Sequence, residues 1–125
     1  MKTLRIGTLP YEDMKARTLA IARGELKRGK DEPKVWLPST ETLGRVLSGP
    51  NRALLAEIAR SKPRTMSELA EKTGRKLSNL SRTLKTMERY GLVTLEKHPD
   101  GSVAPLVAYD ELSVTVPIIA DRNAA

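Results

Sequence analysis

The fold of this chain is decided by residues 65–93, which read TMSELAEKTGRKLSNLSRTLKTMERYGLV. Thr65 and Glu68 have the Thr-x-x-Glu spacing of a capping box, which predicts the start of a short helix, and Gly74 supplies its end. A longer helix is predicted over residues 77–90, because apolar side chains recur there every three or four positions. The stretch therefore predicts two helices joined by a tight turn.

The helix over residues 77–90 is expected to have one apolar and one polar face. Its apolar face consists of Leu77, Leu80, Leu84 and Met87. Its polar face consists of Ser78, Asn79, Arg82, Lys85, Thr86 and Arg89. Arg82 can bind guanine in a bidentate way or hold a phosphate, and Asn79 has the donor and acceptor pair that suits adenine. This face is therefore the one expected to meet duplex DNA.

The elements on either side complete a recognisable order. Upstream, Pro50 suits the first turn of a helix over residues 52–61, whose expected buried stripe is Leu54, Leu55, Ile58 and Ala59. Downstream, the strand-like residues 92–96 and 103–109 flank an Asp-Gly turn, which is typical of a hairpin. Helix, helix, turn, helix and hairpin is the order of a winged helix-turn-helix, in which one helix enters the major groove and the hairpin reaches the flanking backbone or minor groove.

The rest of the chain divides into short elements. Residues 3–7 alternate as in a strand, and residues 34–37 and 112–119 predict two more strands. An amphipathic helix is predicted over residues 11–27, with Met14, Thr18, Ile21, Ala22 and Leu26 on one face. The expected organisation is an N-terminal appendage and linker (1–32), a winged helix-turn-helix domain (33–119) and a tail (120–125). The fold class is mainly α with a small β-sheet, that is, α+β.

Composition excludes several classes of protein. The 125 residues hold no cysteine and one histidine, which removes disulfides and thiolate chemistry and leaves little for a metal site, so neither an enzyme nor a cofactor is expected. Apolar runs are too short for a membrane span or a secretory signal, so a cytoplasmic protein without a membrane partner is expected. The net charge of +7 favours a polyanionic partner. Residues 51–97 carry eleven basic and five acidic side chains, so the charge is concentrated on the predicted DNA-binding elements.

The same residues carry a resemblance. The pattern S-x-x-S-R-x-L-x-x-M-E-x-x-G-L-V over residues 78–93 resembles the recognition segment of winged-helix repressors of the MarR/ArsR kind. More narrowly, L-x-x-V-L-S-x-x-N-R-x-L-L over residues 43–55 and V-A-Y-D-E-L-S-V-T-V over residues 107–116 are similar to HVO_A0114-type DNA-binding proteins. The resemblance implies a winged helix, DNA binding and a repressor role. It also implies an antitoxin as an alternative, one that binds a toxin through its N-terminal segment and regulates its own operon.

Ten residues are the candidate contacts to double-stranded DNA. They are Arg75, Lys76, Ser78, Asn79, Arg82, Lys85 and Arg89 around the recognition helix, and Lys97, His98 and Ser102 at the tip of the hairpin. A homodimer is expected, because one recognition helix contacts only a few base pairs and specificity generally needs two half-sites. The helix over residues 11–27 is the natural interface. Two alternatives stay open for that helix, which could fold back on its own core or receive a partner protein.

Overall fold

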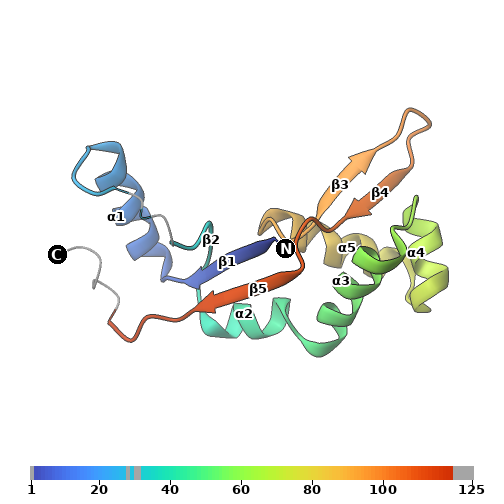
Figure 1. Cartoon of the computed structure of the whole chain (residues 1–125), viewed down its shortest axis with the longest axis horizontal. Helices are drawn as coiled ribbons and strands as arrows, with labels where there is room; N and C mark the ends of the chain where they lie inside the picture. The colour runs from blue at the N-terminus through green and yellow to red at the C-terminus, as the bar shows by residue number, and fades with distance from the viewer. Residues whose placement is uncertain (1, 28, 30–31, 120–125) are drawn as a thin grey trace. The chain divides into compact units, whose positions relative to one another are not determined.

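The computed structural model describes residues 2–27, 29 and 32–119, which form an α+β protein with five helices and five strands (Figure 1). The predicted α+β class is confirmed. The chain divides into two compact units. We call Lys2 with residues 46–110 the helical unit, and residues 3–45 with 111–119 the sheet unit. The predicted tail, residues 120–125, and residues 28, 30 and 31 of the predicted linker lie outside the described residues.

The helical unit contains the three helices α3 (Gly49–Ser61), α4 (Met66–Thr73) and α5 (Leu77–Arg89). Their ends follow local sequence signals. Ser48 Oγ accepts a hydrogen bond from Asn51 N (3.4 Å) at the start of α3, and Pro50 occupies the first turn. Gly74 ends α4 with φ +72°, a left-handed conformation that glycine adopts without strain.

The capping box of α4 forms with one difference from the prediction. Thr65 Oγ1 accepts a hydrogen bond from Glu68 N (3.1 Å), as expected. The Glu68 carboxylate accepts in return from Arg64 N (3.2 Å), one residue before the amide of Thr65. Both bonds satisfy main-chain N–H groups at the start of the helix, so the box still stabilises this end of α4.

The core of the helical unit is built from one side of each helix. Its fully buried side chains include Leu54 and Ile58 of α3, Leu69 of α4, and Leu80, Leu84 and Met87 of α5. Two predicted core residues are exposed instead. Ala59 lies on the outer side of α3, and Leu77, at 48% exposure, is the first residue of α5 and lies N-terminal to the buried part of that helix.

A hairpin follows α5 and has shorter strands than predicted. Strands β3 (Thr94–Lys97) and β4 (Val103–Leu106) pair antiparallel, with Lys97 opposite Val103 next to the turn. Leu92 and Val93, predicted as strand, are buried residues that precede β3. The hairpin packs on the helices through contacts of β3 with α5 and of β4 with α3 and α4. It is thereby fixed to the helical core along its base.

The sheet unit is organised around a central parallel strand. Strand β1 (Thr3–Thr8) lies between β2 (Val35–Leu37) and β5 (Glu111–Thr115) and is parallel to both (Figure 1). Leu4 is in register with Leu112, and Ile6 with both Val35 and Val114. Leu4 and Ile6 are buried, so one face of this sheet is apolar.

This pairing divides the chain differently from the expected boundaries. Residues 1–32 were expected to stand apart from residues 33–119, but β1 belongs to the first range and both of its partners belong to the second. Strand pairing between distant segments therefore brings β1, α1 and β2 together with β5 in one unit. Helix α2 (Thr40–Val46) completes the path toward the helical unit, and Ser39 Oγ caps it by accepting from Thr42 N (3.1 Å).

Helix α1 (Tyr11–Ala22) is shorter than the predicted helix over residues 11–27. It ends five residues early because Gly24 follows with φ +76°, which breaks the helical path. Arg17 of α1 lies over the ring of Trp36 in β2, 5.4 Å from the ring centroid, and pairs with Glu32. These contacts of Arg17 join α1 to β2 and to Glu32 within the sheet unit.

Candidate nucleic-acid interface

Helix α5 separates apolar from polar side chains around its circumference. Leu80, Leu84 and Met87 are almost completely buried. On the opposite side the exposed residues are Ser78, Asn79, Arg82, Lys85 and Arg89. Thr86 is half-buried, and its hydroxyl donates to the carbonyl oxygen of Arg82 (3.2 Å). The burial of Leu80, Leu84 and Met87 thus turns the predicted polar face outward. Thr86 differs from the other residues of that face because its hydroxyl bonds to the main chain of α5.

The N-terminal end of α5 is electrostatically positive. Lys76 occupies the N-cap position without a side-chain hydrogen bond to the first turn, and that turn contains no acidic residue. Helix N-termini expose N–H groups and the positive end of the helix dipole, and both favour anions. Exposed Lys76 and Ser78 lie at this end. The local chemistry suits a phosphate oxygen.

Arg75 has a different environment from the other candidates. It is half-buried, and its guanidinium donates to the carbonyl oxygen of Pro50 (3.0 Å), at the start of α3. Its own N–H donates to Thr73 Oγ1 (3.3 Å). These bonds tie the turn between α4 and α5 to α3. In this arrangement Arg75 positions the N-terminus of α5.

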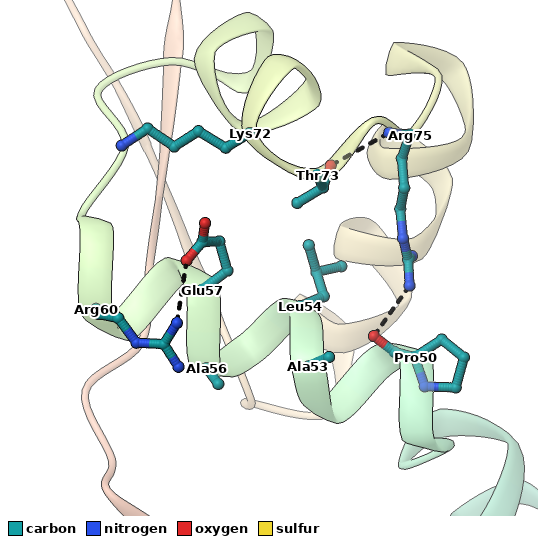
Figure 2. Close-up of a pocket in the computed structure, with 9 residues that line it drawn as sticks. All are labelled: Pro50, Ala53, Leu54, Ala56, Glu57, Arg60, Lys72, Thr73 and Arg75. Carbon is teal, nitrogen blue, oxygen red and sulfur yellow. Dashed lines mark hydrogen bonds and ion pairs between the residues drawn. The ribbon is translucent and has the colours of Figure 1, made fainter.

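The same arginine lines a groove of about 440 Å³ between α3 and α4 (Figure 2). The groove is lined by Pro50, Ala53, Leu54, Ala56, Glu57, Arg60, Lys72, Thr73 and Arg75. Three cations stand around it, but each has a partner in the protein: Arg60 is 3.7 Å from Glu57, Lys72 is 3.7 Å from Glu68, and Arg75 binds the Pro50 carbonyl. The pairs of Arg60 and Lys72 each lie within one helix, α3 and α4 respectively, whereas the bond of Arg75 joins the turn after α4 to α3.

The turn of the hairpin is held by its own hydrogen bonds. Asp100 accepts from both the hydroxyl (2.6 Å) and the N–H (2.9 Å) of Ser102. These bonds, the hydroxyl's first, lower the pKa of Asp100, because they stabilise the ionised carboxylate. Gly101 adopts φ +91° at the tip. Ser102, predicted to contact DNA, is thus engaged in shaping the turn.

His98 joins the hairpin turn to the loop before α4. Its Nε2 lies 3.0 Å from the carbonyl oxygen of Arg64, which acts as acceptor, and the ring is half-buried. Lys97, its neighbour, is exposed and remains available at the end of β3. Exposed Arg64 therefore enters the candidate surface next to the hairpin, although sequence reasoning missed it. No local signal could have found it, since 34 residues separate it from His98.

In the described part of the chain, no group of three or more His, Asp or Glu side chains is arranged to hold a metal ion. Among the same residues, no helix has both the length and the apolar character that a membrane crossing requires.

Comparison with known proteins places this site in a family. The fold is α+β, and residues 46–114 match the model of the HVO_A0114 family, which covers residues 46–110 of the helical unit and most of β5. Since this match spans more than half of the chain, the protein belongs to the HVO_A0114 family. No curated protein and no solved structure matches the chain.

Proposed function

We propose that this protein is a sequence-specific double-stranded DNA-binding regulator of transcription, acting as a repressor. In this proposal α3, α4 and α5 with the β3–β4 hairpin act as a winged helix-turn-helix. Helix α5 lies in the major groove, and the hairpin reaches the flanking backbone or minor groove. The observation that carries the proposal is the outward face of α5, where Asn79 and Arg82 are exposed above buried Leu80 and Leu84.

The dimensions and side chains of α5 support this reading. An α-helix with its side chains is about 10–12 Å across, and the major groove is about 12 Å wide. Arg82 supplies the fork of donors that fits guanine O6 and N7, and Asn79 fits adenine N6 and N7. These two residues are proposed to read bases. Lys76, Ser78, Lys85 and Arg89 are proposed to hold phosphates and so to fix the register on the duplex.

The wing has a smaller proposed share of the contacts. Lys97 is exposed at the end of β3, and Arg64 lies exposed beside the turn through its bond to His98. Both cations suit phosphates that flank the major-groove contact. His98 and Ser102 are proposed to keep the turn in shape, since both make hydrogen bonds within the protein.

Specificity on a genome needs more than one such helix. One helix contacts only a few base pairs, so we propose that a homodimer binds two half-sites about 34–36 Å apart, which is one helical turn of DNA. The charge of residues 51–97 predicts steep salt dependence. With six or more phosphate contacts, affinity should fall about a thousandfold or more between 50 and 200 mM salt.

Selection of bound sites from random duplexes tests the proposal, with the upstream region of the protein's own gene as a second substrate. A consensus should emerge, and Arg82→Ala should cost about 1–3 kcal/mol on it and relax the preference at one position. Glu71→Ala is the control variant, because Glu71 is exposed and lies on α4 rather than on α5. Unchanged binding by Arg82→Ala, or the absence of any salt-dependent duplex binding, would overturn the assignment.

A further inference from the structure

The two outer strands of the parallel sheet differ in how well they are protected. Strand β2 has three residues and is flanked by Pro33 and Pro38, and short strands with prolines resist pairing with another chain. Strand β5 has five residues, and no proline lies between Leu106 and Val116. In the part of the chain that the structure describes, β5 pairs only with β1. Its outer N–H and C=O groups are therefore available to a further strand.

The apolar face of the sheet continues to this open edge. Val114 is in register with buried Ile6, and Leu112 with buried Leu4, so these four side chains share one face. Exposure rises at the edge, where Val114 is 43% and Val116 is 48% exposed. A sheet face that is buried in its centre and open at its edge gains from extension by another strand, which removes more apolar area from water.

We propose that two copies of this chain associate through β5, with the two strands antiparallel about a twofold axis at Val114. This register places Val114 opposite its own copy, Leu112 opposite Val116, and Ser113 opposite Thr115. Apolar side chains thus meet apolar ones, and hydroxyls meet hydroxyls, which are favourable cross-strand pairs. The two three-stranded sheets become one continuous sheet.

The pattern of β5 favours a second copy as its occupant. A twofold interface must be self-complementary, because the same patch is used on both sides. The strand contains a single charged residue, Glu111, and this register sets it opposite Pro117 at the end of the pairing rather than opposite another carboxylate. Nothing in β5 therefore opposes pairing with itself. Leu19 is an exposed apolar residue of α1 that lies outside the proposed interface, so a change there serves as a control.

The mass in solution, measured by light scattering after size exclusion, tests the interface. The wild-type protein should have twice the chain mass of 13.8 kDa. Val114→Glu and Val114→Lys should each give the single-chain mass, because two like charges would face each other across the axis. An equimolar mixture of these two variants should regain the doubled mass, since a glutamate then faces a lysine. Only a residue paired with its own copy gives this result.

Two further variants keep the outcome interpretable. Val114→Thr retains the β-branched shape and should remain dimeric, and Leu19→Glu on α1 should also remain dimeric. Circular dichroism checks that each variant folds. A monomeric wild-type protein at about 100 μM, a dimer that survives Val114→Glu, or a charge mixture that stays monomeric would each overturn the proposed interface. The measurement uses no DNA, so it tests the interface separately from the proposed recognition of bases by α5.

Hydrogen exchange gives a second readout on the unmodified protein. Main-chain amides of residues 111–116 that face outward should exchange more slowly as protein concentration rises, because the dimer pairs them. Amides of α1 should show no dependence on concentration. Slowing confined to α1 would place the interface on that helix and would contradict the strand pairing.

Discussion

The imidazole of His98 and the main chain of Arg64 hold the hairpin turn against the loop that precedes α4. His98 Nε2 lies 3.0 Å from the Arg64 carbonyl oxygen across 34 residues of sequence. One end of the hairpin is thus fixed by this bond, and its base by packing on the helices. The proposed wing is held in place relative to α4 before any DNA is bound.

Replacing His98 should loosen this attachment. His98→Ala removes the donor and should lower the free energy of unfolding by about 0.5–1.5 kcal/mol, the usual net value of one hydrogen bond. Urea unfolding followed by circular dichroism measures the change. Lys97→Ala is the matched control, because Lys97 is exposed next to His98. Equal stabilities of the two variants would show that the bond to Arg64 contributes nothing.

Arg82 and Lys85 should differ in what they contribute to DNA binding. Both are exposed one turn apart on α5. Lys85→Ala should weaken binding evenly to the selected site and to a scrambled duplex, and should reduce the salt slope by about one, since it removes one phosphate contact. Fluorescence anisotropy over a range of salt concentrations measures both effects. Loss of sequence preference in Lys85→Ala would contradict this assignment, because it would mean that Lys85 reads bases.

Shortening Leu84 should destabilise the helical unit. Leu84 is completely buried at the centre of the apolar face of α5. Leu84→Ala leaves a cavity, and such changes cost about 2–5 kcal/mol. Thermal unfolding of this variant should be compared with that of Leu77→Ala, whose side chain is exposed at the helix start. The cost at Leu77 should be far smaller, and similar losses would contradict the assigned core.

Ser102 should control the titration of Asp100. The pKa of Asp100 is lowered from its ordinary value of 3.8, chiefly by the Ser102 hydroxyl. A carboxyl whose pKa is lowered by folding contributes stability above its unfolded pKa, and this contribution is lost as the pH falls through the folded pKa. Ser102→Ala should therefore raise the pKa of Asp100 toward 3.8, which carboxyl NMR titration can follow. An unchanged titration would mean that the turn forms without this bond.

Adding a methyl group at Gly7 should disturb the packing of Trp36. A Cβ at Gly7 would lie 2.6 Å from Trp36 Cζ3 and 2.8 Å from Pro33 Cγ, both too close. Gly7→Ala should cost about 1–3 kcal/mol, as overpacking does. Trp36→Leu combined with Gly7→Ala should be less destabilising than the sum of the single changes, because the smaller side chain relieves the contact. Additive losses in chemical denaturation would disprove this contact as the cause.

The features that the sequence predicted well are local ones. Thr65 and Gly74 fix the two ends of α4 through bonds to residues at most four positions away. The polar face of α5 follows from a repeat of three and four residues, which one helix contains by itself. Such signals need no knowledge of the rest of the fold.

What the sequence could not predict depends on distant segments. The parallel register of β1 with β5 joins Thr3 to Glu111, and no local pattern records which strands become neighbours. The bonds of Arg75 to Pro50 and of His98 to Arg64 likewise connect different elements, so two candidate DNA contacts turned out to have partners within the protein. Side-chain identity suggested the chemistry, and tertiary contacts decided which groups remain exposed.

The parallel neighbours β1 and β5 also constrain how the chain can be made and divided. During synthesis β1 leaves the ribosome long before β5, so this half of the sheet cannot close until most of the polypeptide has emerged, and such distant pairing folds slowly. A fragment restricted to residues 46–114 would contain most of β5 but lack β1. Its last strand would then be unpaired on both sides, so expression of that fragment alone should yield a protein prone to aggregate.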